Sequence, residues 1–286
     1  MRLCRFDRDR LGLVLGEEVV DVSAVLDSLP SYRWPLPYGD PLIANLATLR
    51  PRIEALAATS NARRQLSDLA LDSPIANPSK IIAAPVNYAK HIAESRADAG
   101  INFGSDVKSI DHYGLFLKSS TALVGVAEGV RLPSLERRMD HEIELVAVIG
   151  KEGFRIPQAA ALDYVAGYAI GLDMTVRGPE DRSWRKSFDT FAVLGPYLVT
   201  ADELGDPSHL DFSIKVNGAI RQQANTSDLI FGVAKLIEYA SAAYRLYPGD
   251  IIMTGTPEGV GPVVPGDEME CWIDRIGTMR VKIRND

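Results

Sequence analysis

The sequence predicts a β-rich α+β protein with a small α+β unit over residues 1–75 and a larger domain over residues 76–286. Three observations predict it. Many short apolar runs are separated by glycine and proline, one long stretch has helical periodicity, and residues 72–80 contain two prolines and little apolar content, which is typical of a connection between domains. The strand-rich part favours a sandwich, a roll or a barrel with a few helices.

The N-terminal unit begins with short strands. Residues 1–6 and 11–22 have strand character, with a turn at Gly16. Asp40 followed by Pro41 predicts the start of a helix, because a capping side chain before a proline at the first helical position is a common N-terminus. The apolar residues that follow at helical spacing are Leu42, Leu46, Leu49, Ile53 and Leu56.

The larger domain is expected to consist mostly of short strands. The apolar runs that predict them are residues 80–84, 115–118, 130–132, 142–150, 164–172, 197–200, 212–216, 250–254 and 268–273. One helix is predicted over residues 228–245, capped by Thr226, Ser227 and Asp228, because its apolar residues recur at helical spacing. We expect this helix to pack on the sheet.

The composition excludes several classes of protein. A net charge of −7 without a long basic cluster argues against nucleic acid or an anionic membrane as a partner. The N-terminus carries charges where a signal peptide needs an apolar run, and no later run has the length of a membrane span, so a cytoplasmic location is expected. Cys4 and Cys271 lack metal-site spacing and are expected to be buried thiols.

The stretch from residue 138 to residue 150 is the strongest candidate for chemistry. As a strand it places Asp140, Glu142 and Glu144 on one face, which continues with Val146 and Val148. Crowded carboxylates at the end of a buried strand repel one another, and a divalent cation between them would relieve the repulsion. Oxygen ligands alone favour Mg²⁺, Ca²⁺ or Mn²⁺ over zinc. The alternative is a half-exposed strand with solvated glutamates.

A further carboxylate, Asp173, ends the next predicted strand. Counting back by twos gives Gly171, Ala169 and Gly167, so this face has small side chains that leave room for a ligand or for a close neighbouring strand. Asp173 is therefore a candidate third ligand beside the two glutamates. The alternative is a simple turn aspartate.

His91 and Glu94 lie three residues apart and would share one face of a short helix that Asn87 caps. A carboxylate beside an imidazole raises its basicity and fixes its tautomer, as a general base acting on water requires. Most such pairs are surface pairs, so a structural role stays open. Lys186 could neutralise an oxyanion or could simply be solvated.

The loop from Thr254 to Gly261 has three glycines and two threonines. Such a loop suits the approach of a substrate carboxylate to backbone N–H groups, although a plain turn is an alternative. It lacks the lysine of a phosphate-binding loop, so it does not indicate a nucleotide site.

Together these stretches resemble the fumarylacetoacetate hydrolase family, in the order that the family has them, over about residues 78–284. The matching motifs are Asn87-Tyr88 with His91 and Glu94, Phe116-Leu117-Lys118, Glu142-x-Glu144, Asp173-Met174-Thr175, Lys186-Ser187-Phe188-Asp189, Leu194-Gly195-Pro196, the Asn217-Gly218 turn with Gln222, Asn225-Thr226-Ser227-Asp228 and Thr254-Gly255-Thr256-Pro257.

The resemblance implies a mixed β-roll catalytic domain, usually a homodimer, with Mg²⁺ or Mn²⁺ on Glu142, Glu144 and Asp173. It implies a hydrolase acting on a 2-oxo acid of the acylpyruvate type, in which His91, held by Glu94, activates water. Substrate contacts and charge stabilisation are implied for Lys186, Lys118, Thr256, Tyr88, Arg177 and Glu180.

The alternatives are a lyase or isomerase with the same enolate chemistry, acting for example on oxaloacetate, and a non-enzymatic binding protein on the same fold. Two departures from the compact family members bear on the substrate. Glu180 occupies the position where acylpyruvases carry Gln, and residues 95–117 are longer and are expected to form a mobile lid.

Overall fold

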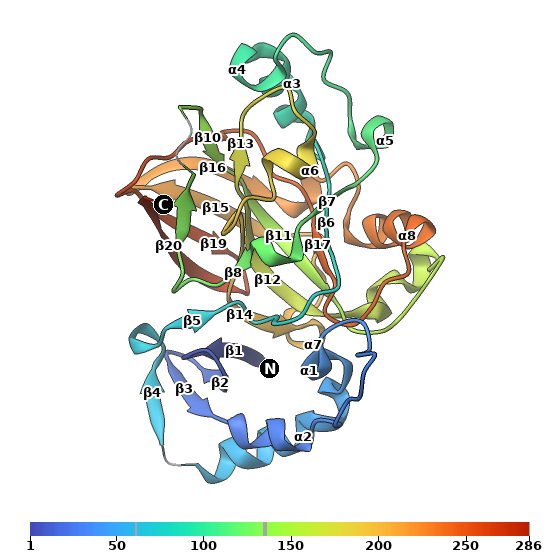
Figure 1. The fold of residues 1–286 in the computed structure, drawn as a ribbon, viewed down its shortest axis with the longest axis vertical. Coiled ribbons are helices and arrows are strands. Elements are labelled where there is room, and N and C mark those ends of the chain that lie inside the picture. Colours follow the sequence, from blue (N-terminus) through green and yellow to red (C-terminus); the bar gives the residue numbers. More distant parts are fainter. Residues whose placement is uncertain (61, 134–135, 286) are drawn as a thin grey trace.

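The computed structural model describes residues 1–60, 62–133 and 136–285, and its central feature is a 12-stranded sheet (Figure 1). The hydrogen-bonded path runs in the order β4 (Arg63–Gln65), β3 (Glu18–Asp21), β2 (Arg10–Leu15), β1 (Arg2–Phe6), β14 (Ala192–Thr200), β12 (Val165–Asp173), β11 (Ile143–Ile149), β17 (Ile251–Met253), β6 (Ile81–Ala83) and β7 (Phe116–Lys118). Two short strands join it at β1 and β14, namely β5 (Leu71–Asp72) and β8 (Leu123–Val124).

Strand β11 is buried on both faces, which confirms that the acidic stretch leads into the core. Its alternate residues enter two different hydrophobic clusters, with Ile143 and Leu145 in one and Val146 and Val148 in the other. This alternation is the period of two that an extended chain imposes. The strand is separated from β10 (Met139–His141) by Glu142, where the chain leaves one sheet for another.

Two smaller sheets complete the β structure. One has the order β13 (Thr175–Val176), β10 and β18 (Gly261–Pro262), and the other has the order β16 (Ala219–Asn225), β15 (Asp211–Val216), β19 (Glu268–Ile273), β20 (Gly277–Asn285) and β9 (Val130–Leu132). The predicted β-rich α+β class is therefore confirmed. The strands β16 and β20 were not predicted, because neither contains a continuous apolar run. In β16 only Gln222 is buried, and in β20 exposed residues alternate with buried ones.

Helices lie around these sheets. The α-helices are α1 (Pro41–Ala44), α2 (Leu46–Thr59), α3 (Ala89–Ala97), α4 (Ala99–Asn102), α5 (Ile110–Tyr113), α6 (Arg182–Arg185), α7 (Ala201–Leu204) and α8 (Val233–Ala243), and the 3-10 helices are Ser23–Ser28, Leu66–Asp68, Ser120–Ala122, Gln158–Tyr164 and Thr226–Asp228. None of the described helices has the length and apolar character needed to cross a bilayer.

Two predicted helix starts and one strand differ from the structure. Helix α8 begins at Val233 after Gly232, because the predicted cap at Thr226 forms a separate 3-10 turn. Helix α3 follows Tyr88, since the Asn87 side chain instead donates to the carbonyls of Phe231 and Thr254 at 2.9 and 2.8 Å. Strand β14 starts at Ala192, five residues before the predicted start, and continues through a Gly-Pro pair that resembles a turn.

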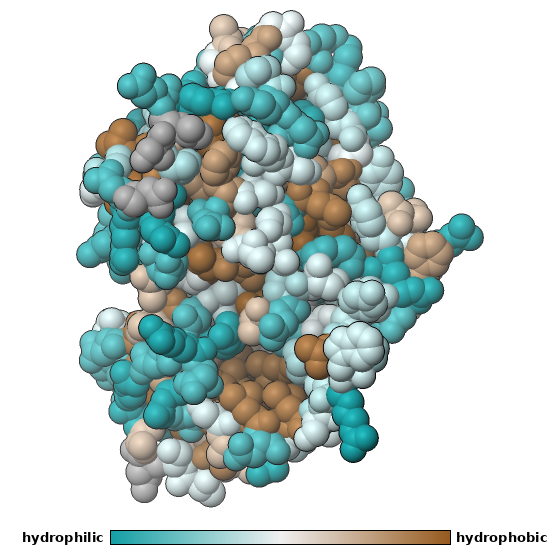
Figure 2. Space-filling view, in the orientation of Figure 1, coloured by the Kyte–Doolittle hydropathy of each residue, from teal (hydrophilic) through white to brown (hydrophobic). Residues whose placement is uncertain are grey.

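The N-terminal residues have their own hydrophobic cluster but share the main sheet. The cluster gathers buried side chains from the first strands and from α1 and α2, and Figure 2 shows hydrophobic residues at the surface between β2 and α2. Strand β1 pairs antiparallel with β14 through Arg2–Val199 and Leu3–Leu198, so the sheet is continuous across the two parts. The division at residue 75 stays a prediction.

Asp40 fixes the junction between these parts, and its loss is expected to destabilise the fold. One carboxylate oxygen accepts from the N–H groups of Leu42 and Ile43, and the other accepts from those of Ala76 and Asn77, all at 2.9 to 3.1 Å. Because four backbone donors would lose a buried partner, Asp40→Ala should lower the free energy of unfolding by about 2 to 4 kcal/mol.

Urea denaturation at equilibrium measures this difference. The exposed Asp27, which lies in a 3-10 helix of the same part of the chain, provides the control. Asp27→Ala should change the free energy of unfolding by less than about 0.5 kcal/mol. Equal stability of the two variants would contradict the assigned role of Asp40.

Candidate active site

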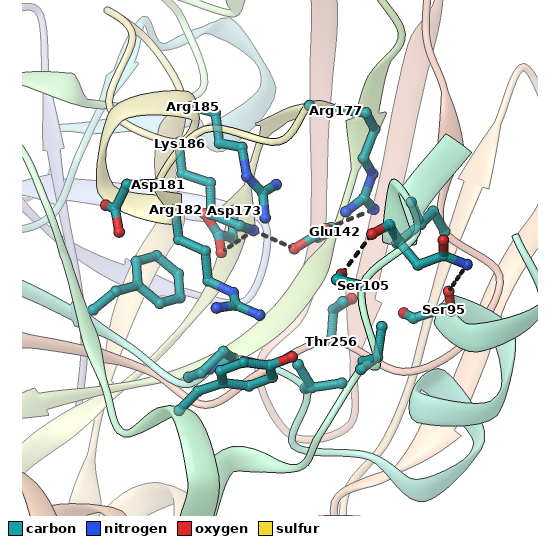
Figure 3. Close-up of a pocket in the computed structure, with 18 of the residues that line it drawn as sticks. Ser95, Ser105, Glu142, Asp173, Arg177, Asp181, Arg182, Arg185, Lys186 and Thr256 are labelled. Atoms are coloured by element: carbon teal, nitrogen blue, oxygen red, sulfur yellow. Dashed lines mark hydrogen bonds and ion pairs between the residues drawn. The ribbon is translucent and has the colours of Figure 1, made fainter. Parts of the chain in front are cut away.

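A cavity of about 370 Å³ lies where β11 and β12 end against α3, α5 and α6 (Figure 3). Most of the predicted site residues line it. Of the predicted residues, those that line it are His91, Glu142, Glu144, Asp173, Arg177, Glu180, Lys186 and Thr256. Tyr88, Glu94 and Lys118 lie outside this lining. Tyr88 packs edge-on against Phe212, and Lys118 is buried behind Asp173.

Three buried carboxylates meet at one wall of the cavity. Glu142, Glu144 and Asp173 each offer an oxygen, and these atoms lie within 4.8 Å of one another. Strands β11 and β12 are adjacent in the sheet, and Ile143 pairs with Leu172, so the ends that carry these residues coincide. This pairing brings together carboxylates that are about 30 residues apart in the sequence.

The small residues before Asp173 serve strand packing. A side chain at Gly171 would place its Cβ atom 2.4 Å from Val146, and one at Gly167 would place it 2.3 Å from the carbonyl oxygen of Val199. The sequence left open whether these small residues make room for a ligand or for a close neighbouring strand. In the structure they make room for neighbouring strands.

The charges of the three carboxylates are only partly compensated by protein groups. Burial opposes ionisation of Glu142, but Lys186 and Arg177 outweigh it and hold the pKa of this carboxyl well below its usual range. Burial and the nearby charge of Asp173 raise the pKa of Glu144 well above its usual range. Three buried carboxylates repel one another, and here one of them resists ionisation because of burial and this repulsion. A divalent cation between them would relieve the repulsion.

Three oxygen donors without nitrogen or sulfur suit Mg²⁺ or Mn²⁺. The loop after β17 supports one of them, because the backbone N–H of Gly255 donates to Glu144 Oε2 at 2.7 Å. Gly255 has φ +99°, and an added Cβ atom would lie 2.8 Å from that of Asn87, so glycine is required there. The donor set of Glu142, Glu144 and Asp173 fits a hard divalent ion.

The basic residues of the site are held by these same acids. Lys186 Nζ donates to Glu142 at 2.6 Å, to Asp173 at 2.7 Å and to the Thr175 hydroxyl at 2.7 Å. Lys118 also donates to Asp173, and burial lowers its pKa although Asp173 opposes the shift. The two lysines thus hold Glu142 and Asp173, whereas the Gly255 N–H group holds Glu144.

Asp140, which the sequence placed on one face with Glu142 and Glu144, is buried and pairs with arginines beside the carboxylate cluster. Its two oxygens accept from Arg138 and Arg177 at 2.7 Å each, and Arg177 also donates to Glu142 at 2.8 Å. Arg138 in turn pairs with Asp98, the N-cap of α4. A chain of alternating charges therefore joins the carboxylate cluster to the helical segment above it, which pattern reasoning could not show.

His91 lies in the first turn of α3 and is oriented by Glu94. Nδ1 of the imidazole is 2.9 Å from Glu94 Oε2, and Glu94 Oε1 accepts from the N–H of Gly259 at 2.8 Å. With Nδ1 held by the carboxylate, Nε2 is the ring nitrogen that remains for the cavity, which His91 lines. The pair has the geometry that a general base requires.

Thr256 and Glu180 already have protein partners. The Thr256 hydroxyl donates to the carbonyl of Ile143 and accepts from Gln222, both at 2.8 Å. Glu180 forms two hydrogen bonds with Arg137 at 2.7 and 2.8 Å, which lower its pKa and offset its charge. The acidic residue at this position therefore adds little net negative charge to the cavity.

Residues 95–117 contain the end of α3, then α4 and α5 with their connections, and the start of β7, and several of their side chains line the cavity. The expectation that this segment is a mobile lid stays a prediction. Sequence reasoning missed Tyr113 in this segment and Arg182 and Arg185 in α6, although two arginines at a spacing of three residues were a signal for a shared helical face.

Buried carboxylates, lysines and an oriented histidine around one cavity are typical of an enzyme active site built around a divalent ion. Residues 80–284 match the family model described as fumarylacetoacetate (FAA) hydrolase, C-terminal. The chain therefore belongs to the fumarylacetoacetate hydrolase family, as its motifs indicated.

Full-length relatives support this assignment. A maleylpyruvate hydrolase of Aquipseudomonas alcaligenes is 55% identical over 287 residues, which is 100% of both chains. The crystal structure of a maleylpyruvate hydrolase from Sphingobium sp. SYK-6 in complex with manganese(II) and pyruvate has a TM-score of 0.83 and 41% identity, over 100% of this chain and 99% of that one. A mitochondrial oxaloacetate tautomerase of Bos taurus is 34% identical over 99% of this chain and 91% of its own.

Proposed function

We propose that this protein is a divalent-metal-dependent hydrolase that cleaves a carbon–carbon bond of an acylpyruvate, a 2,4-dioxo acid, to pyruvate and a carboxylic acid. The observation that carries the proposal is that His91, which Glu94 orients, lines the same cavity as the cluster of Glu142, Glu144 and Asp173. Full-length similarity to maleylpyruvate hydrolases supports a maleyl group as the acyl part.

Glu142, Glu144 and Asp173 would hold Mg²⁺ or Mn²⁺. When bound, such an ion supplies a Lewis acid that stabilises negative charge on the oxygens of a 2-oxo acid. Lys186 and Arg177 keep Glu142 ionised for this purpose, and Lys118 with Lys186 fixes Asp173. The protein thus provides a preorganised set of oxygen donors whose orientation costs nothing when the reaction occurs.

His91 would accept a proton at Nε2 from a water molecule, because Glu94 holds Nδ1 and stabilises the charged ring. The water oxygen forms a bond with the acyl carbonyl carbon. The bond between that carbon and the methylene carbon of the pyruvate part then breaks, and its electron pair passes to a pyruvate enolate. The proton held by His91 returns to that fragment, so atoms and charge balance.

A panel of substrates tests the proposal. We expect the protein with Mn²⁺ to release pyruvate from maleylpyruvate and acetylpyruvate, and EDTA to stop this release. No turnover of any 2,4-dioxo acid at saturating Mn²⁺ would contradict the hydrolase and favour a binding protein on the same fold. Pyruvate release that is unaffected by complete removal of the metal would contradict the role of the carboxylates.

A tautomerase or decarboxylase is the second candidate, because relatives named as oxaloacetate tautomerases share 34% to 38% of their residues with this chain. The same carboxylates and lysines would stabilise an enolate of a 2-oxo diacid, and no water has to attack. Oxaloacetate belongs in the panel for this reason. Turnover of oxaloacetate together with inert acylpyruvates would favour this candidate.

We further propose that the protein is a cytoplasmic homodimer. The family resemblance supports the dimer, and light scattering after size-exclusion chromatography would test it, with a mass near that of one 31.2 kDa chain as the contradicting result. Two free, buried cysteines suit a reducing compartment. Fractionation of cells that express the protein would test the location.

A further inference from the structure

Two of the four arginine and lysine side chains that line the cavity have no carboxylate partner among the described residues. Arg177 and Lys186 are bound by the acidic cluster. Arg182 and Arg185, both in α6, form no ion pair within residues 1–60, 62–133 and 136–285. A positive charge in a concave site without a counterion marks a place for an anionic group.

The two arginines share one side of the cavity. They lie three residues apart in the single turn of α6, whose N-cap is Asp181, and neighbours at this spacing lie on the same helical face. Figure 3 shows both guanidinium groups turned toward the space that Glu142 and Thr256 also face.

Each guanidinium is held in place by neutral groups. Arg182 lies over the ring of Tyr113, with its guanidinium carbon 4.0 Å from the ring centroid, and Arg185 Nε donates to the carbonyl of Glu180 at 3.2 Å. Burial and the nearby charge of Arg177 lower the pKa of Arg185 to about 10, so it remains positively charged at neutral pH. The remaining N–H donors of both side chains are available to a ligand.

We propose that Arg182 and Arg185 bind a second carboxylate of the substrate, at the far end of its acyl group. Guanidinium groups match a carboxylate through paired N–H donors, which gives both charge and orientation. The enzyme would thereby select dianionic acylpyruvates over those with an uncharged acyl group. This inference rests on the proposed function, because it assigns the acyl part of the same substrate.

The position of the arginines fits the far end of the substrate. Lys186 contacts Glu142 and Asp173, which mark the place of the pyruvate part, and Arg182 precedes Lys186 by four residues. Lys186 is the C-cap of α6, and side chains at this spacing have Cβ atoms roughly 5 to 6 Å apart, which is the scale of a short acyl chain. Arg185 lies closer to the carboxylates, whose charges act on it, so it would contact the near side of the same acyl carboxylate. Glu180 does not oppose an anion there, because Arg137 pairs with it.

The test compares two substrates and three variants. Pyruvate release from maleylpyruvate, a dianion, and from acetylpyruvate, a monoanion, is measured for the wild type, Arg182→Gln, Arg185→Gln and the double variant. We expect each single change to lower kcat/KM for maleylpyruvate by roughly tenfold to hundredfold, because a charge-assisted hydrogen bond is lost. The value for acetylpyruvate should change by less than about threefold.

Arg245→Gln is the matched control. It removes one arginine that is exposed at the end of α8 and outside the cavity, so both substrates should react as in the wild type. Arg182→Lys and Arg185→Lys keep the charge and should retain part of the preference for the dianion. If the Gln variants fail to fold, these Lys variants still test the inference. Equal losses with both substrates, or no loss with either, would overturn the inference.

Binding of the two product classes separates this inference from the proposed function. Calorimetric titration with maleate should show affinity that falls at least tenfold in the Gln variants, whereas titration with pyruvate should give unchanged affinity. A wild type that cleaves neither substrate refutes the hydrolase, and the maleate titration still decides the role of the arginines. Maleate affinity equal in wild type and double variant would overturn that role.

Discussion

Glu144→Gln is expected to abolish both metal binding and pyruvate release while the protein remains folded. Glu144 is the most suitable of the three acids to change, because it accepts a hydrogen bond from the backbone N–H of Gly255, whereas Glu142 and Asp173 also bind lysines. The hydrogen-bond partners of metal ligands already contribute roughly 10- to 100-fold to affinity, so loss of a direct ligand should weaken Mn²⁺ binding by more than about a hundredfold.

The metal-free variant should be at least as stable as the metal-free wild type, because Gln keeps the shape of Glu and removes a carboxyl group whose ionised form burial and Asp173 disfavour. Calorimetric titration with Mn²⁺ and thermal unfolding with and without EDTA measure the two quantities. Glu17→Gln, in the exposed turn between β2 and β3, is the control and should behave as the wild type. Wild-type Mn²⁺ affinity in Glu144→Gln would refute the assigned ligand set.

His91→Ala is expected to lower kcat for cleavage of an acylpyruvate by about 10²- to 10⁴-fold, the usual contribution of a general base. The metal site should keep its ligands, because His91 forms its hydrogen bond with Glu94 and is not one of the three carboxylates, although its charge helps to lower the pKa of Glu142. Mn²⁺ affinity should therefore equal that of the wild type. The combination of intact metal binding with lost turnover separates a chemical role from a structural one.

A second histidine provides the comparison. His209 is exposed and lies far from the cavity lining, so His209→Ala should keep full activity. An assay with oxaloacetate distinguishes the two candidate reactions, because enolisation or decarboxylation needs no water activated by His91. If His91→Ala still released pyruvate from an acylpyruvate at the wild-type rate, the hydrolytic mechanism would be wrong.

The sequence predicted the site well where local pattern decides the outcome. The period of two along residues 140–150 placed Glu142 and Glu144 at the end of a buried strand, and the spacing of His91 and Glu94 placed both on one turn of α3. The motif order then identified the family. These inferences succeeded because side-chain direction within one element depends only on its backbone geometry.

Local pattern was less informative at element boundaries. Asn87 resembles a helix cap, yet its amide bonds the carbonyls of Phe231 and Thr254, more than 140 residues away. Strand β14 contains a Gly-Pro pair that resembles a turn, and its register with β12 is irregular between Tyr168 and Ile170. Tertiary hydrogen bonds outweighed the local preference in each case.

By itself the sequence determined the candidate ligands, the histidine pair and the family, because these depend on residue identity and short spacing. Only the tertiary structure decided how their charges are balanced. Asp140 is buried against Arg177, Glu180 is paired with Arg137, and Arg182 and Arg185 line the cavity with no acid partner in the part of the chain that the structure describes. The physical reason is that burial and ion pairing depend on which distant strands and helices meet, and spacing along the chain does not contain that information.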